Sequence, residues 1–253
     1  MMAFARMLGA VHRSRVIAEY RGHPGLQQRL GRHCRMNLSF GLHFGWAIEG
    51  AVGSEFKIDA SYLSPNVSVA ESIEHATQVY SVSILLSEQV RNICSAAMAS
   101  QCRLIDKVVL TGSSQAIELY VFDLDHLSLT VEKPRPVASP PWTSRQRFKA
   151  RQKLEAEKNA KWHAGTDIVE EFFANRDIST MRERYTQEFL SIFNMGYQNY
   201  SQGEWQVAQR LLSRTRIMLG MDDGPSTALL RFMGTPYDYV APTDWKGKHE
   251  LFT

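Results

Sequence analysis

The order of hydrophobic patterns between residues 35 and 123 is the feature that most limits the fold of this chain. Alternating and short apolar runs predict strands, and runs with helical spacing predict helices. The expected order is strand 35–45, strand and hairpin 46–60, helix 66–79, strand 82–86, a helix from Ser87 to about residue 97, and strands 102–111 and 115–123. An N-terminal helix over 4–20 precedes them. The order β-β-α-β-α-β-β predicts an α+β sandwich with a mainly antiparallel sheet.

The composition changes after Asp125. Residues 133–142, KPRPVASPPW, hold four prolines, which predict an extended linker within 126–144. A basic helical segment follows at 145–180, in which 145–162 carries seven lysines and arginines against two glutamates. Three interpretations stay open for it: a solvated helix face, a docking surface for an acidic partner, or an RNA-binding surface.

The last part, residues 181–253, predicts a helical hairpin with a tail. Aromatic residues recur at helical spacing from Tyr185 to Tyr200, Gly203 interrupts the pattern, and a second apolar stripe starts at Trp205. This arrangement is of the tetratricopeptide (TPR) kind. One such hairpin cannot bury its own apolar face, so it must pack on the rest of the chain or on a partner. Trp245 is the expected anchor of the tail.

Composition excludes several classes of protein. The net charge of +3 over 253 residues is too small to indicate a nucleic acid partner. The three cysteines, Cys34, Cys94 and Cys102, are odd in number and lack Cys-x-x-Cys spacing, so neither a disulfide framework nor a zinc site is expected. A reducing compartment suits them. No apolar run approaches the roughly 20 residues of a membrane-spanning helix.

The N-terminus, the glycines and the histidines could each indicate a targeting or functional feature or an ordinary structural one. Residues 1–18 contain basic residues and no acidic one, which suits a mitochondrial transit peptide or an ordinary helix of the domain. Gly41, Gly45, Gly50 and Gly53 have the wrong spacing for a phosphate-binding loop; they predict bulges or close backbone approach along strands. His33, His43 and His75 lack metal-ligand spacing and are expected to be surface or packed imidazoles.

Residues 40–79, FGLHFGWAIEGAVGSEFKIDASYLSPNVSVAESIEHATQV, resemble the middle of a class III adenylate/guanylate cyclase catalytic domain, closest to the form of single-celled eukaryotes. The resemblance runs from about residue 4 to 125. In the tail, YxxGxWxxAxxLL, DDGPS and PxDWxG resemble the C-terminal extension of these cyclases. It implies a truncated cyclase-like (ferredoxin-like) domain at 1–125, followed by linker, basic segment and helical extension.

The family resemblance also implies a site. Cyclases of this class act as dimers, and two aspartates on the first strand and following hairpin hold two metal ions. That strand and hairpin, with the base-selecting lysine, would lie before residue 1, so no metal ligand and no cofactor is expected. Asp59 in KIDASY matches the purine-selecting acid of the adenine type. Ser68 and Ser72 occupy the positions of the catalytic asparagine and arginine.

A resemblance to cyclases normally predicts catalytic activity, but the residues at these two positions predict its absence. Loss of one preorganised donor costs about 3–4 kcal/mol of transition-state stabilisation, and here an amide and a guanidinium are both replaced by Ser68 and Ser72. We therefore expect an inactive homologue that acts as a structural or regulatory subunit of a protein assembly in a protist, in a cilium or a mitochondrion. Asp59 is then a remnant of purine recognition, and no catalytic residue is expected.

Two alternatives stay open. The chain could supply one half of a heterodimeric adenylate cyclase that converts ATP to cAMP, with the metal site on a cyclase-fold partner. It could also be part of a longer product, because residues 1–20 align with an internal helix of the family, which would make Met1 an internal methionine. Partners in every case are proteins, with no nucleic acid and no transmembrane segment expected.

Overall fold

The computed structural model describes residues 1–21, 23–31, 36–111, 113, 115–133, 143–165 and 168–251. His33, Cys34 and most of the proline-rich linker lie outside these described residues. None of the described helices is both long enough and apolar enough to cross a membrane.

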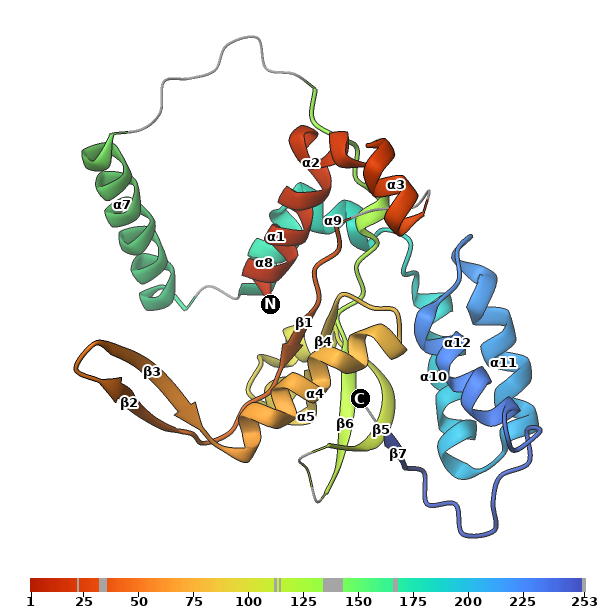
Figure 1. Cartoon of the computed structure of the whole chain (residues 1–253). Helices are drawn as coiled ribbons and strands as arrows, with labels where there is room; N and C mark the ends of the chain where they lie inside the picture. The colour runs from red at the N-terminus through yellow and green to blue at the C-terminus, as the bar shows by residue number, and fades with distance from the viewer. Residues whose placement is uncertain are drawn as a thin grey trace.

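The described residues form a mixed α/β structure (Figure 1). The strands are β1 (Phe40–Leu42), β2 (Ile48–Ser54), β3 (Lys57–Leu63), β4 (Ile84–Ser87), β5 (Arg103–Leu110), β6 (Ala116–Val121) and β7 (His249–Leu251). The helices of the first half are α1 (Met2–Arg13), α2 (Arg15–Tyr20), α3 (Pro24–Leu30), α4 (Pro65–Val79), α5 (Glu88–Asn92), α6 (Ala96–Ala99) and the 3-10 turn η1 (His126–Ser128). The second half contains α7 (Ser144–His163), α8 (Ile168–Ala174), α9 (Arg176–Arg182), α10 (Gln187–Gln202), α11 (Trp205–Met218) and α12 (Gly224–Gly234).

The main sheet is mixed, not mainly antiparallel as the sequence predicts. Its order is β1-β4-β6-β5-β7, in which β4–β6 and β6–β5 are antiparallel while β1–β4 and β5–β7 are parallel. The chain leaves β1, passes through α4 and returns to β4, and such a crossover makes neighbouring strands parallel. The α+β class is confirmed, and the two parallel pairs at the edges are the correction.

Three local expectations also need correction. The predicted strand 35–45 shrinks to Phe40–Leu42, and the N-terminal helix is interrupted at Ser14, whose hydroxyl caps α2 by accepting from the Ile17 amide. Ser87 does not cap α5 with its side chain, and α5 ends at Asn92 well before residue 97. Helix α4, the hairpin β2–β3 and the basic helix α7 match their predicted ranges to within a few residues.

Helix α4 lies across the sheet because its sequence defines both its start and its buried face. Ser64 caps the helix by accepting from the Asn66 amide, and Pro65 occupies the first turn. Val69, Ile73 and Ala76 are buried against the sheet. A Cβ at Gly41 would overlap backbone atoms of Ala70 and Glu74, so β1 can pack this closely on α4 only with glycine there.

The helical hairpin α10–α11 and helix α12 pack on the sheet and share its core. Phe193, Tyr200 and Trp205 are buried in the same cluster as Ile105 and Leu119 of the sheet. The apolar face of the hairpin is thus buried within the chain, the first of the two possibilities that the sequence leaves. The anchor role expected for Trp245 is confirmed, since its indole Nε1 donates to the carbonyl oxygens of Tyr200 and Ser201 at 3.1 Å.

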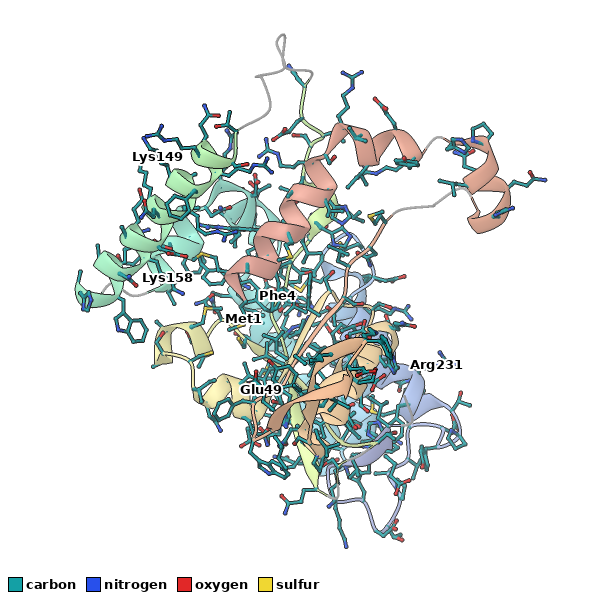
Figure 2. All side chains as sticks on the ribbon, turned by 60° about the vertical axis from the view of Figure 1, so that its left-hand side comes forward. Met1, Phe4, Glu49, Lys149, Lys158 and Arg231 are labelled. Atoms are coloured by element: carbon teal, nitrogen blue, oxygen red, sulfur yellow. The ribbon has the colours of Figure 1, made fainter. Side chains whose placement is uncertain are left out.

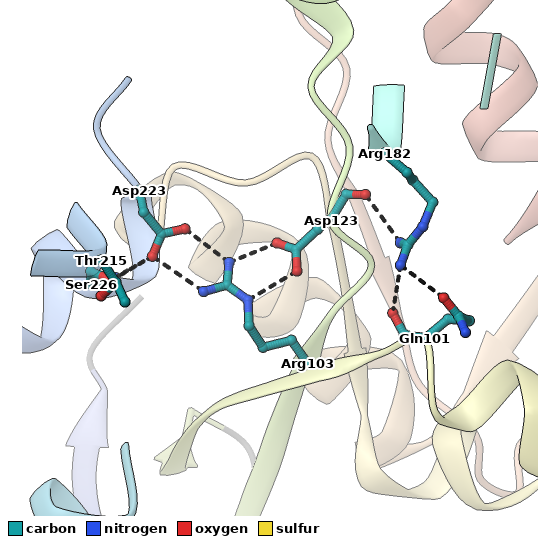
Figure 3. Close-up of polar contacts among 7 residues, drawn as sticks. All are labelled: Gln101, Arg103, Asp123, Arg182, Thr215, Asp223 and Ser226. Atoms are coloured by element: carbon teal, nitrogen blue, oxygen red, sulfur yellow. Dashed lines mark hydrogen bonds and ion pairs between the residues drawn. The ribbon is translucent and has the colours of Figure 1, made fainter. Parts of the chain in front are cut away.

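A buried arginine joins the sheet to α12 (Figure 3). Arg103 at the start of β5 donates to both carboxylate oxygens of Asp123 at 2.7 and 2.9 Å, and to those of Asp223 at 2.9 and 3.2 Å. Its guanidinium lies over Phe193, 4.2 Å from the ring centroid. Burial alone would lower the pKa of Arg103, but the two carboxylates raise it above its ordinary value.

Asp223 serves two elements at once. Its carboxylate also caps α12, because Oδ2 accepts from the amide and the hydroxyl of Ser226 at 2.9 and 2.6 Å. The DDGPS motif is therefore the point at which the C-terminal helices are fastened to the sheet. Asp106 makes a second junction, accepting from the hydroxyls of Tyr80 on one side and Tyr200 of α10 on the other.

Replacing Asp223 by alanine tests this junction. We expect Asp223→Ala to lower the free energy of unfolding by about 3–5 kcal/mol, because it leaves the buried Arg103 half-paired. The neighbouring Asp222 is exposed, so Asp222→Ala is the matched control, with an expected change within about 0.5 kcal/mol. Urea unfolding followed by circular dichroism gives both values, and equal losses in the two variants would contradict the role of Asp223.

Candidate functional site

The three residues singled out by the sequence lie on the hairpin β2–β3 and on α4. The hairpin projects away from the main sheet, and every residue of both strands is exposed (Figure 1). Asp59 lies opposite Val52 on this hairpin and forms an ion pair with Lys57 at 2.9 Å. Its side chain is 62% exposed. In the described part of the chain, Asp59 therefore stands on a projecting arm rather than in a pocket.

Ser68 and Ser72 lie one turn apart on α4 and differ in their surroundings. Ser68 is exposed. Ser72 is buried, with 7% of its surface exposed, and its hydroxyl donates to the carbonyl oxygen of Thr111 at 3.0 Å. Thr111 directly follows β5, so Ser72 ties α4 to the end of that strand. The residue that the resemblance aligns with a catalytic arginine is thus a structural contact of the core.

A polar cluster at the base of the hairpin was not predicted from the sequence. The His43 ring bonds through Nδ1 to the Ser87 hydroxyl at 2.9 Å and through Nε2 to the Asn66 side-chain oxygen at 3.1 Å. Asn66 and Ser64 both donate to the carbonyl oxygen of Trp46, at 2.8 and 2.6 Å. The cluster links β4, the segment after β1 and the start of α4.

The sequence signal for this cluster is a glycine, Gly45, at a point of close packing. A Cβ at Gly45 would overlap the Asn66 side chain, so the glycine in HFG allows the chain to pass over the helix start. This confirms close backbone approach at Gly41 and Gly45, as the sequence predicts. His43 uses both ring nitrogens and the Ser87 hydroxyl is drawn to it, which explains why Ser87 does not cap α5.

The chemistry available around α4 is limited. The cluster consists of an imidazole, an amide and hydroxyls, and it contains no carboxylate that could hold a divalent cation. Among the described residues, no group of three or more histidines, cysteines, aspartates or glutamates is placed to hold a metal ion. The buried carboxylates of Asp106, Asp123 and Asp223 are all engaged by tyrosine, arginine or backbone donors.

Neither of the two described thiols is set up as a nucleophile. Cys102 is buried, and burial raises the pKa of its thiol to about 12, so it stays protonated at neutral pH. Burial also raises the pKa of the half-buried Cys94. Both cysteines are free thiols in the described structure, and Cys34 lies outside it.

Comparison with known proteins relates part of the chain to cyclases. An adenylate cyclase of Anabaena cylindrica is 36% identical over 87 residues, which are 34% of this chain and 17% of that protein. The aligned part is thus a small fraction of the relative. No protein-family model and no solved structure matches the chain. The chain contains a region related to an adenylate cyclase.

Restoring the family residues tests whether α4 still has room for them. We expect Ser72→Arg to lower the free energy of unfolding by at least about 2 kcal/mol, because it overfills a buried site and leaves a charge without a partner. Ser68→Asn, on the same helix but exposed, should change it by less than about 0.5 kcal/mol. Chemical denaturation measures both. If Ser72→Arg left the free energy of unfolding unchanged, the structure would have room for an arginine at this position, which would contradict our expectation.

Proposed function

We propose that this chain is a degenerate, catalytically inactive homologue of class III nucleotidyl cyclases that serves as a structural or regulatory subunit of a protein assembly. The observation that carries the proposal is the hydrogen bond from the buried Ser72 to the Thr111 carbonyl oxygen. A residue that belongs to the site in the family belongs to the core here. Reversion to arginine would therefore break packing as well as fill a site.

The surroundings of Asp59 support the same proposal. A purine-reading carboxylate works in a pocket that excludes water, where a hydrogen bond to the base is not lost to solvent. Asp59 instead faces solvent and is paired with Lys57, two residues away on the same strand. An exposed pair of this kind contributes little to stability or binding. The proposal treats Asp59 as a remnant without a ligand.

The exposed hairpin supports a protein partner. An isolated two-stranded hairpin is marginally stable in water, and this one carries large apolar side chains on both faces. Those more than half exposed are Ile48, Val52, Phe56, Ile58, Tyr62 and Leu63, and the preceding Trp46 is also 63% exposed. We propose that a partner protein, of cyclase fold or another fold, covers this arm in the assembly.

Helix α7 supports a second contact. Its twenty residues are exposed apart from partial cover at Ala150, and Thr143 with Gln146 forms a capping box at its start. Figure 2 shows Lys149 and Lys158 on this helix, which lies apart from the sheet. Phe148, Leu154 and Trp162 are all more than 60% exposed. A basic helix with exposed aromatic residues favours docking to an acidic protein surface among the three interpretations that the sequence leaves open.

The remaining parts of the proposal concern organisation and setting. We place the cyclase-like region at 1–125, the linker at 126–144, the basic segment at 145–180 and a TPR-like extension at 181–253. The assembly we propose is that of a protist, either a ciliary axoneme or a mitochondrial complex. The resemblance to cyclases of single-celled eukaryotes supports a protist as the source. The absence of acidic residues from the N-terminus supports a mitochondrial complex as one of the two settings.

The second candidate, half of a heterodimeric adenylate cyclase, is favoured by one observation: Asp59 lies on a projecting arm that could enter a partner's site. Co-expression with a complete cyclase chain, followed by a cAMP assay of the pair and of each chain alone, separates the two candidates. We expect the cAMP yield of the complete chain to be unchanged by this one. A yield that depends on this chain, and falls with Asp59→Ala, would replace our proposal by the second candidate.

The hairpin gives the direct test of assembly. In cells that carry the native complex, we expect the tagged chain to migrate with a large assembly on native gels. The double variant Phe56→Glu and Ile58→Glu should shift it to the size of the free chain, because charges replace apolar side chains that are 90% and 70% exposed. Ser213→Glu, at an exposed site on α11, should leave migration unchanged. A monomeric wild-type chain would contradict the proposal.

A further inference from the structure

A hollow of about 870 Å³ opens on the side of the sheet where α9 and α10 pass α5 and the start of β5. Its walls come from these segments, from Phe173 of α8 and from Tyr120 of β6. Asp59, Ser68 and Ser72 take no part in it. The hollow is therefore a feature separate from the cyclase-like positions, and the proposed function leaves it unused.

Arg91, in the last turn of α5, is the distinctive side chain of this hollow. Its guanidinium lies over the Tyr120 ring, 4.9 Å from the centroid, and the Tyr120 hydroxyl is itself fixed by donating to Glu118 at 2.8 Å. Within the described residues, the Arg91 side chain makes no hydrogen bond and no ion pair, and its Nε is buried without a partner. The terminal Nη groups of this half-buried side chain are not buried in the same way, so they are the donors that a ligand in the hollow could reach.

The other arginines that line the hollow are already engaged. Arg103 is held by Asp123 and Asp223. Arg182 donates to the backbone oxygen of Asp123 at 3.2 Å and to the side-chain oxygen of Gln101 at 3.0 Å (Figure 3). Of the described arginines around this hollow, Arg91 is thus the one whose side chain makes no hydrogen bond, although Arg182 also lacks an ion pair.

Tyr185 adds a second free donor. It lines the hollow, and its hydroxyl has no hydrogen-bond partner in the described part of the chain. Burial raises the pKa of Tyr185 well above its ordinary value, so the hydroxyl keeps its proton at neutral pH. The remaining polar lining is mostly neutral, with serine and threonine hydroxyls and side-chain amides.

The charge around the hollow limits the ligand. Arg91 and Arg182 are the arginines of its described lining that have no ion pair, and Glu183 is the one carboxylate there, so these groups leave one net positive charge. A singly charged carboxylate balances that charge and binds a guanidinium in a two-pronged geometry, whereas a doubly charged phosphate would exceed it. Phe173, 45% exposed, and Tyr120 give the hollow an aromatic wall.

From these contacts we propose that the hollow is a binding site for a small organic monocarboxylate with an aromatic or apolar body, whose carboxylate pairs with Arg91. The body packs against Tyr120 and Phe173, and Tyr185 supplies a further donor. This inference is independent of the proposed function, since neither the hairpin nor α4 contributes to the hollow.

The test uses benzoate as the probe and benzamide, its uncharged counterpart, on the full chain, with binding followed by NMR and calorimetry. We expect benzoate to bind at about millimolar concentration, as befits so small a ligand, and benzamide to bind about 10- to 100-fold more weakly. Arg91→Gln should remove the preference for benzoate. Arg91→Lys, which keeps the charge but loses the planar fork, should retain part of it.

Arg210→Gln is the matched control, because Arg210 lies on α11 away from the hollow. It should bind benzoate as the unaltered chain does, and all variants should give the same circular dichroism spectrum and melting temperature. The inference is overturned if benzoate does not bind, if Arg91→Gln binds it equally well, or if inorganic phosphate binds more tightly than benzoate.

Discussion

The contact of Arg103 with Asp123 and Asp223 is the interaction on which the rest of the structure depends. It joins β5 and the segment that follows β6 to the start of α12, and all three side chains are almost fully buried. One buried cation shared by two carboxylates requires that both carboxylates stay in place, because either one alone leaves an imperfectly compensated charge in the core. The position of the C-terminal helices relative to the sheet therefore follows from this contact and the aromatic core around it.

That arrangement also explains how one side of the main sheet is covered within this chain. Helices α10, α11 and α12 pack on that side and share its apolar core. Helix α4 is held by Ser72 at one point and by the cluster around His43 and Asn66 at its start. Of the three positions that the resemblance singles out, Ser72 is part of this packing, whereas Ser68 and Asp59 are exposed, as is the hairpin for which we propose a partner.

Sequence patterns predicted those elements whose signals are local. Helical spacing predicted α4 at 66–79, the pattern over 46–60 predicted the hairpin, and Trp245 stood out as the anchor of the tail. The parallel pairing of β1 with β4 and of β5 with β7 could not be read in the same way. The partner of an edge strand is set by tertiary packing, and β7 returns to β5 only after the whole helical hairpin.

The site residues show the same limit. The resemblance identified Asp59, Ser68 and Ser72, but it could not predict that Ser68 is exposed and Ser72 is buried. Ser72 is buried because the end of β5 packs against it. The partners of Arg103 lie 20 and 120 residues away, and several other aspartates were equally plausible from the sequence. His43 and Ser87, 44 residues apart, meet because β1 and β4 are neighbours, which the sequence did not predict.

A calorimetric titration of the purified chain with ATP, with and without Mg²⁺, tests the central claim most directly. A cyclase site binds its nucleotide through metal ions, so a working or latent site must show binding that depends on the metal. For an inactive homologue without a metal site, we predict that Mg²⁺ makes no difference to the heat of ATP addition. Micromolar ATP binding that appears only with Mg²⁺ would contradict that claim.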